Sequence, residues 1–247
     1  MFDYIFGENR MSFLYSYFTD WRPLMKKLLM LTHSAGFVHD YLPTAEKVVT
    51  EIGVASGRFE TTTTQDCSLI HAENLKQYDA LLFATTGELP FSDAQKQALI
   101  GFVKSGGAFI GVHNATDTFY EFSEYGEMIG GYFDGHPWTQ EIVAVVEDAD
   151  HPSTRHLEPS FTVFDEIYIH RDWSREKTHV LIRLDNASVD VSKGKRADQD
   201  YALAWCHPYG EGRVFFTAFG HPKELWGESW FRNHLLGGIL WAMDRVE

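Results

Sequence analysis

The stretch GGAFIGVHNATDTFY, residues 106–120, decides the fold class of this chain. Its first part, AFIGV, is an apolar run without polar alternation, which is typical of a strand covered on both faces of a sheet. The run ends at Val112, and a sharp turn is predicted at His113, where the small residues Gly111 and Ala115 lie on either side. This pattern is similar to a nucleophile elbow, a turn that pushes one side chain out above the sheet. We therefore expect His113 to project at the carboxyl edge of the sheet.

Strand-like and helix-like segments alternate in the chain before this turn. Ser92 is a favourable helix cap and Gly106 a favourable helix terminator, so they bound one of the helices. The β-α-β-α-β order predicts an α/β fold in which a mostly parallel sheet carries helices on both faces. Ligands are then expected beyond the carboxyl ends of the strands. The strand-like runs are residues 27–32, 59–64, 78–86 and 108–113, and the helix-like segments are residues 43–55, 72–77 and 92–106.

The second half of the chain is less regular. Residues 202–221 predict two strands joined by a hairpin at Tyr209–Gly212. The other expected elements are strands at residues 141–147 and 179–184, an exposed loop at 185–199, and a closing helix at 230–243. No repeat or linker interrupts residues 25–247, so we expect one domain there.

Residues 1–24 read differently from the rest. They lack the basic start and unbroken apolar block of a secretory signal. Two interpretations stay open for this N-terminal extension. It is either an arm that docks through aromatic residues such as Phe6 and Phe13, or sequence upstream of a functional start at Met25.

Composition narrows the class of function. The formal net charge of −14 disfavours binding to a phosphate backbone, so we expect no nucleic-acid partner. No apolar stretch approaches the ~20 residues that a membrane span requires. Cys67 and Cys206 form no CxxC pair or disulfide framework, which fits a reducing compartment. We therefore expect a cytoplasmic protein, either a monomer or a homo-oligomer, with a small-molecule ligand.

Polar residues follow three of the expected strands. His33, His39 and Asp40 come after the first strand, His113 after the strand at 108–113, and His221 after the last strand. The carboxyl ends of parallel strands meet at one edge of a sheet, so we predict that His39, His113 and His221 share one pocket. For each histidine a structural hydrogen bond is the alternative.

Carboxylates and further polar groups lie near these segments. Asp117 follows the predicted turn, His136 lies in GGYFDGHPW, and Asp165 and Glu166 are adjacent in FDEIY. Histidines and carboxylates that converge from separate loops either bind a divalent metal such as Zn²⁺ or act as acid and base on a hydroxylated substrate. No pair has the spacing of an HExxH helix, so both readings stay open.

Aromatic residues are 15% of the chain and crowd the segment after the turn. Sugar rings pack their C–H faces on such side chains, so we predict Tyr120 and Trp138 as walls of a sugar site. Glu88 also follows a strand, so it is a further but weaker candidate for the site. Residues 150–155 are read as a structural loop with a turn at Pro152.

The segment TAFGHPKE, residues 217–224, resembles the FHPE segment of class I glutamine amidotransferases. In that superfamily the histidine is the base of a Cys-His-Glu triad. Neither cysteine of this chain lies on an elbow, so the triad is incomplete and amidotransfer is excluded. The likeness of fold remains.

Several segments in order resemble the ThuA-like family, named for trehalose utilisation. They are GFVHD, GVHNATDTFY, YGEMIGGYFDGHPW, VEDADHPSTRHL, FDEIY, WCHPYGEGRVFFTAFGH and FRNHLLGGILWA. The resemblance runs from about Met25 to the C-terminus and implies a fold like that of class I glutamine amidotransferases, a flavodoxin-like sheet with extra strands. At the position of His207 we expect the residue to vary within the family, which weakens a catalytic role for this histidine.

The resemblance also implies a role in the use of trehalose and related disaccharides, with a partner oxidoreductase that makes 3-keto sugars. It implies a polar pocket, whose members would be His39, His113, Asp117, His136, Glu166 and His221. As an enzyme, the chain would use His113 or His221 as a base, with Asp117 or Glu166 orienting it and with a divalent metal as a candidate cofactor. The alternative is a binding or regulatory module without chemistry.

Overall fold

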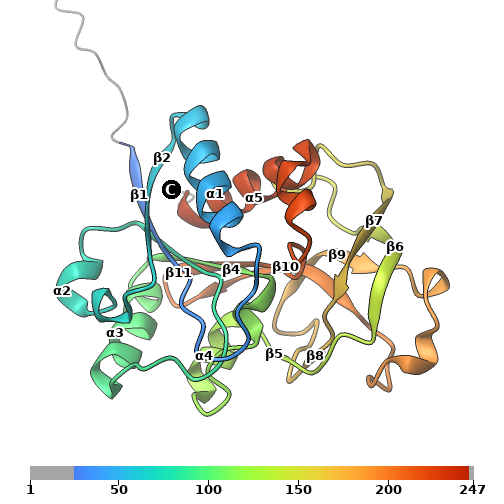
Figure 1. Cartoon of the computed structure of the whole chain (residues 1–247), viewed down its shortest axis with the longest axis horizontal. Helices are drawn as coiled ribbons and strands as arrows, with labels where there is room; N and C mark the ends of the chain where they lie inside the picture. Colours follow the sequence, from blue (N-terminus) through green and yellow to red (C-terminus); the bar gives the residue numbers. More distant parts are fainter. Residues whose placement is uncertain (1–24, 245–247) are drawn as a thin grey trace, which may run out of the picture.

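The structure is a computed structural model that describes residues 25–244 of the chain. Its centre is a nine-stranded sheet with the order β2-β1-β3-β4-β11-β10-β9-β6-β7 (Figure 1). The strands of this sheet are β1 (Lys26–Leu31), β2 (Phe59–Thr64), β3 (Ala80–Phe83), β4 (Ala108–Val112), β6 (Trp138–Val146), β7 (Ser160–Ile167), β9 (His179–Leu184), β10 (Ala202–Tyr209) and β11 (Gly212–Thr217). A second, two-stranded sheet pairs β5 (Tyr132–Phe133) with β8 (His170–Arg171).

The first five strands of the large sheet confirm the predicted fold class. Strand β1 pairs in parallel with β2 on one side and β3 on the other, and β3, β4 and β11 continue the parallel order. The strand order therefore reverses at β1, which places a switch point at the carboxyl ends of these strands. From β11 onward the sheet is antiparallel, through β10, β9, β6 and β7.

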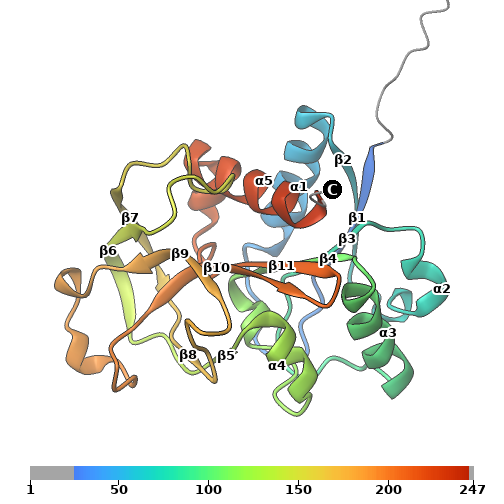
Figure 2. The same ribbon diagram turned by 180° about the vertical axis from the view of Figure 1, so that it is seen from behind.

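Helices cover both faces of the sheet, as predicted. Figures 1 and 2 show α1 and α5 on one face and α3 and α4 on the other. Each face has its own apolar core, which includes Val49 and Ile239 on the first face and Leu99 and Met128 on the second. The α-helices are α1 (Leu42–Ser56), α2 (Ala72–Leu75), α3 (Asp93–Lys104), α4 (Ser123–Ile129) and α5 (Ser229–Met243).

Local chemistry sets the ends of the two best-predicted helices. Helix α1 has a proline in its first turn and ends at Gly57, whose φ of 64° is favourable for glycine. Helix α3 begins with a capping box in which the Ser92 hydroxyl accepts from the backbone of Gln95, while the Gln95 side chain accepts from the backbone of Ser92. Both helices lie where the sequence predicted them.

The second half confirms some expectations and extends others. The hairpin β10–β11 turns at the predicted place, with Tyr209 opposite Gly212. The predicted strand at 141–147 begins earlier, at Trp138, and the predicted loop at 185–199 contains two short 3-10 turns. Strand β7 was not predicted, because its core-facing positions include the aspartate Asp165. A charged residue at such a position hides the apolar alternation of a strand.

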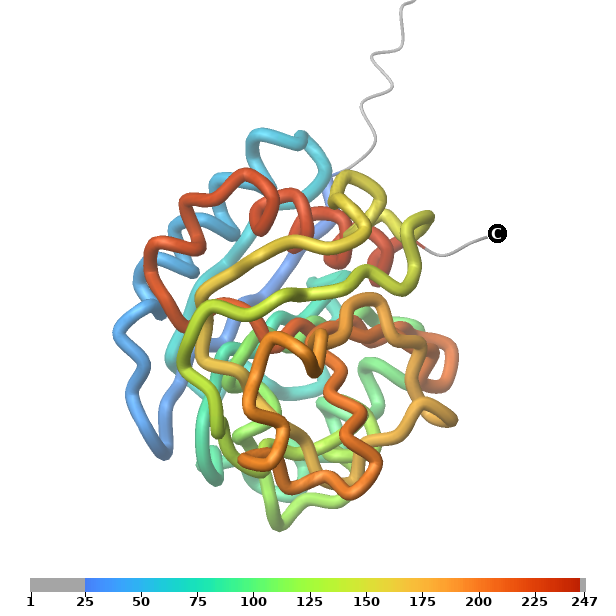
Figure 3. Tube along the Cα trace, turned by 90° about the vertical axis from the view of Figure 1, so that its right-hand side faces the viewer, coloured from blue at the N-terminus to red at the C-terminus, as the bar shows by residue number. Residues whose placement is uncertain are grey.

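The sheet curls so that its last strand returns toward its centre. Asp165 of β7 accepts hydrogen bonds from the backbone of Gly220 and His221, which follow β11. These contacts link strands that lie four places apart in the sheet order. Figure 3 looks onto this side of the molecule. The carboxyl end of β7 therefore lies beside the carboxyl end of β11.

Three remaining expectations concern the termini, the cysteines and the membrane. The expectations for residues 1–24 fall outside the described residues. Cys67 and Cys206 are both buried and free. Within residues 25–244 no helix has the length and apolarity that a bilayer crossing demands.

Candidate functional site

The predicted turn is present at the end of β4, but the His113 side chain, which was expected to be exposed there, is buried. His113 directly follows this strand and adopts a φ of 45°, in the left-handed region that L-residues seldom occupy. Its side chain is fully buried, and its Nδ1 lies 2.7 Å from the carbonyl oxygen of Ala218. Because a carbonyl only accepts, Nδ1 carries the hydrogen and Nε2 presents a lone pair. His113 is thus fixed in orientation and in tautomer.

Three other side chains meet His113 from separate elements. His39 comes from the loop between β1 and α1, His221 from the segment after β11, and Glu166 from the end of β7. One ligand atom of each of the four residues lies within 4.8 Å of those of the others. We call this group, His39, His113, Glu166 and His221, the histidine–glutamate cluster. The predicted meeting of the three histidines is therefore present in the structure.

The shortest contacts within the cluster form a triangle. Nδ1 of His221 lies 3.2 Å from Nε2 of His113 and 3.1 Å from Oε2 of Glu166. The third side, from Nε2 of His113 to Oε2 of Glu166, measures 3.6 Å. Lone pairs converge inside this triangle, and either a proton on His221 or a bound cation satisfies them. The His39 ring stands edge-on to the other two, with centroids 5.3 Å and 5.4 Å away.

Electrostatics within the cluster agree with this arrangement. Burial alone would raise the pKa of Glu166, but its close contacts with His113 and His221 outweigh that effect and hold the pKa well below its ordinary value. The hydrogen bond to Glu166 raises the pKa of His221 against the effect of burial. Burial, together with the neighbouring imidazoles of His113 and His221, lowers the pKa of His39 to about 4. The cluster thus contains an anionic carboxylate beside a neutral His39.

The donor set fits a divalent transition metal. Tetrahedral coordination with bonds of about 2.0–2.1 Å places neighbouring ligand atoms roughly 3.3 Å apart, close to the three sides of the triangle. Imidazole nitrogen with one carboxylate suits zinc and related ions. The carbonyl of Ala218 also supplies the outer hydrogen bond that orients a metal-binding histidine. Any cation here would be held by the histidine–glutamate cluster.

Several supporting residues were not predicted. The Asn114 amide lies 3.0 Å from Nδ1 of His39 and accepts a hydrogen bond from the Tyr41 hydroxyl at 2.8 Å. The Tyr168 ring packs on His113 with centroids 4.2 Å apart. Asn114 and Tyr41 lie within two residues of predicted histidines, so sequence adjacency was a usable signal. No spacing rule points to Tyr168.

His136 contacts the cluster, and Asp117 interacts electrostatically with His113 and His136. Asp117 accepts a hydrogen bond from the Tyr120 hydroxyl, and burial raises the pKa of this carboxyl while that bond opposes the rise. Nδ1 of His136 lies 3.3 Å from Oε1 of Glu166. Glu166 therefore contacts His136 on one side and the triangle on the other.

Trp138 requires a correction. Its side chain is 1% exposed, and its indole nitrogen donates to the carbonyl of Asp190. The ring packs edge-on against Tyr201 in the core, so it offers no free face to a sugar. Trp138 is the first residue of β6, and at this position its side chain points into the core.

Other candidate residues lie outside the cluster. Nδ1 of His33 contacts the carbonyl of Gln65, Asp40 pairs with Lys223, and Glu88 accepts from the backbone of Glu121. His207 is buried and contacts the carbonyl of Met128. These residues therefore make structural contacts, which were the alternative to a role in the site.

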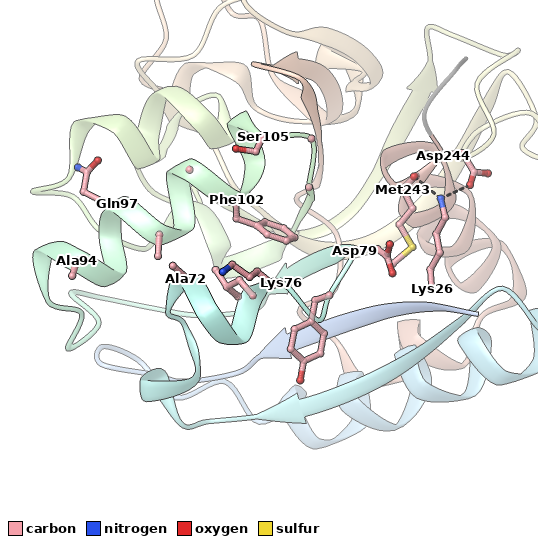
Figure 4. Close-up of a pocket in the computed structure, with 16 residues that line it drawn as sticks. Lys26, Ala72, Lys76, Asp79, Ala94, Gln97, Phe102, Ser105, Met243 and Asp244 are labelled. Atoms are coloured by element: carbon pink, nitrogen blue, oxygen red, sulfur yellow. Dashed lines mark hydrogen bonds and ion pairs between the residues drawn. The ribbon is translucent and has the colours of Figure 1, made fainter. Parts of the chain in front are cut away.

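A spacious pocket among the described residues lies elsewhere. It has a volume of about 1530 Å³ and includes Lys26, Lys76, Asp79 and Phe102 (Figure 4). Lys26 begins β1 and Asp79 precedes β3, so this pocket opens at the amino ends of the strands. None of its lining residues belongs to the histidine–glutamate cluster. This pocket is therefore separate from the histidine–glutamate cluster.

Comparisons with known structures agree on the fold. A ThuA-like protein of Bacteroides uniformis ATCC 8492 is 20% identical, with a TM-score of 0.72 over 88% of this chain and 91% of that chain. Another, from Parabacteroides merdae ATCC 43184, is 19% identical with a TM-score of 0.70 over 90% and 93%. A cytoplasmic protein of Salmonella typhimurium LT2 is 14% identical with a TM-score of 0.58 over 90% and 100%. These likenesses concern the fold alone.

Comparisons of sequence identify the family. Among curated proteins no relative matches the chain. The family model described as trehalose utilisation matches residues 27–242, nearly the whole described chain. The elbow, the switch point and the segments quoted above all fall within that match. The chain therefore belongs to the ThuA family.

Proposed function

We propose that this chain is a metal-dependent enzyme of carbohydrate use that acts on a trehalose-type disaccharide or its 3-keto derivative. The observation that carries the proposal is the triangle of His113, Glu166 and His221 at the carboxyl edge of the sheet, with His39 beside it. This edge is the ordinary ligand site of such folds. The family description supplies the substrate class.

The proposed chemistry is proton transfer next to a polarised oxygen. When bound, a divalent ion such as Zn²⁺ would polarise a keto or hydroxyl oxygen of the sugar. Asp117 is the candidate acid or base, because it is half-buried and its carboxyl has a raised pKa. Tyr120 donates to this carboxyl and holds it in place. His136 contacts Glu166 and would bind a sugar hydroxyl.

Amidotransfer has no support in the described residues. Burial raises the pKa of the Cys67 thiol to about 11 and that of the Cys206 thiol to about 12, so neither forms a thiolate at neutral pH. The elbow, where amidotransferases have their cysteine, has His113 here. A cytoplasmic location is part of the proposal, since a structural neighbour is described as cytoplasmic.

Elemental analysis and turnover test the proposal. Protein purified without a histidine tag should contain close to one equivalent of a transition metal, and a chelator should abolish turnover of 3-keto-trehalose. His113→Ala and Glu166→Gln should each lose the metal and the turnover. His33→Ala is the matched control, because this histidine lies on the same loop as His39 but contacts only the Gln65 carbonyl.

Two results would contradict the proposal. Less than about a tenth of an equivalent of metal, with no thermal shift on adding one, would remove the metal site. Sugar binding in calorimetry without any product over hours would instead support the alternative of a binding module.

A further inference from the structure

A second, shallow pocket lies beside the histidine–glutamate cluster, and of its lining residues only Tyr120 has a role in the chemistry above. It has a volume of about 450 Å³ and combines segments from β5, β8 and the loop before β10. Its lining residues are Tyr120, Phe133, Asp134, Gly135, Arg171 and Lys195.

Aromatic contacts connect this pocket to the cluster. The Phe133 ring lies 4.2 Å from the Tyr168 ring, which in turn lies 4.2 Å from the His113 ring. His136 stacks on Phe133 with centroids 5.8 Å apart and contacts Glu166 through its Nδ1. Tyr120, which lines the pocket, donates to Asp117. A ligand bound at the cluster would therefore extend into this pocket.

The charged groups of the pocket are already paired. Nζ of Lys195 lies 3.2 Å from Oδ1 of Asp134, and the Arg171 guanidinium donates to Asp172 at 2.9 Å. Two cations are thus matched by two carboxylates, and the Arg171 guanidinium also covers the Tyr120 ring at 5.3 Å. An anion would have to compete with these carboxylates for both cations. A neutral polyol, by contrast, can hydrogen-bond to both members of the Lys195–Asp134 pair while its C–H face packs on an aromatic ring.

We propose that this pocket binds the second ring of an unphosphorylated disaccharide whose first ring occupies the histidine–glutamate cluster. The proposal rests on the proposed function for its substrate class. It adds where the second ring of that disaccharide lies and that this ring carries no charge. A monosaccharide would occupy the cluster alone and leave the pocket empty.

Calorimetry on the full chain tests this without relying on turnover. The probes are trehalose, glucose and trehalose 6-phosphate. Wild-type protein should bind trehalose at least tenfold more tightly than either of the others. Lys195→Met, which keeps the length of the side chain and removes its charge, should weaken trehalose binding about tenfold to a hundredfold, the effect of one lost hydrogen bond to a charged group. Glucose binding should not change.

A second variant tests the pairing of charges. Asp134→Asn keeps the shape of the side chain and frees the Lys195 ammonium, so trehalose 6-phosphate should gain affinity while trehalose loses it. Lys76→Met is the matched control, since Lys76 is similarly exposed and paired with Glu73 but lies at the opposite edge of the sheet. It should leave all three affinities unchanged.

Three outcomes would overturn the subsite. They are equal affinity of the wild-type protein for trehalose and glucose, tighter binding of the phosphorylated sugar, and a loss in Lys195→Met that is the same for glucose as for trehalose. Failure of the proposed function would look different. There the protein would lack metal or turnover while the calorimetric preference for trehalose persisted.

Discussion

Asp165 is not a member of the histidine–glutamate cluster, but two members of the cluster depend on it for their positions. Its carboxylate is fully buried and accepts from three backbone N–H groups, those of Glu166, Gly220 and His221. Burial raises the pKa of this carboxyl, and the three hydrogen bonds oppose the rise. Asp165 therefore fixes the backbone that carries two members of the cluster.

We predict that Asp165→Asn loosens the cluster and destabilises the fold. The amide places an N–H group where only acceptors fit, so the free energy of unfolding should fall by about 2–4 kcal/mol. Metal affinity should fall roughly tenfold to a hundredfold, as for other residues that orient ligands. Urea denaturation and metal titration measure the two effects.

The matched control is Asp66→Asn. Asp66 is also an aspartate that accepts from a backbone N–H, that of Ser68, but it is exposed and caps a 3-10 turn where asparagine serves equally well. A loss of stability in the control as large as that in Asp165→Asn would refute the role given to burial.

The residues of the cluster differ in how far the sequence predicted them. His113, His221 and His39 were found because each follows a strand whose apolar run is easy to recognise. Glu166 was named as a candidate carboxylate, but its strand was not. Tyr168 was missed because its contact with His113 depends on how β7 bends back, which no local pattern records.

At the scale of elements, the turn at the end of β4 depends on the absence of a side chain at Gly111. A Cβ there would lie 2.9 Å from Cδ2 of Phe216 and 3.0 Å from Cδ1 of Ile129. Both neighbours are buried in the core on that face of the sheet. The elbow at His113 therefore needs a strand that packs without a side chain two residues before the turn.

We predict that Gly111→Ala destabilises the protein by about 1–3 kcal/mol through overpacking. Gly101→Ala is the opposite case, because a Cβ at this position in α3 meets nothing within 4 Å. Alanine in that helix should stabilise by about 0.5–1 kcal/mol. Thermal unfolding of both variants measures the difference, and equal shifts in Tm would show that packing at Gly111 does not constrain β4.

The elements themselves were predicted unevenly. The parallel half, with its buried apolar strands and its capped helices, follows from the sequence because each signal is local. The order of the antiparallel half does not, since β7 was not recognised as a strand and β6 pairs with β9 across the intervening segment. Trp138 is an example. It was predicted as an exposed wall of a sugar site because the strand that it begins was placed three residues too late.

At the scale of the whole molecule, three buried histidines link stability to pH. Burial lowers the pKa of His234 and of His170 to about 3, and that of His151 to about 4, from an ordinary value of 6.5. Below pH 6.5 the unfolded chain takes up protons that the folded chain excludes. Their contribution to stability is therefore present above pH 6.5 and is lost as the pH falls toward 3–4.

We predict that His234→Asn weakens this dependence. Each such histidine contributes a slope of about 1.4 kcal/mol per pH unit, so the variant should lose roughly that much slope between pH 6 and pH 4. Urea denaturation at a series of pH values measures it. His71→Asn is the control, since His71 is exposed and its role as a helix cap suits asparagine. Identical slopes for wild type and His234→Asn would rule out this source of acid sensitivity.

The curl that brings β7 beside β11 has a consequence for how the protein matures. The cluster takes His39 from near the start of the described chain and His221 from near its end, so a ribosome-bound chain lacks a complete cluster until β11 and the following turn have emerged. A chain that stops before β11 keeps three of the four ligands but loses the strand that positions them. Uptake of the proposed metal would then report that both halves of the sheet have joined, since contacts so distant in sequence form late in folding.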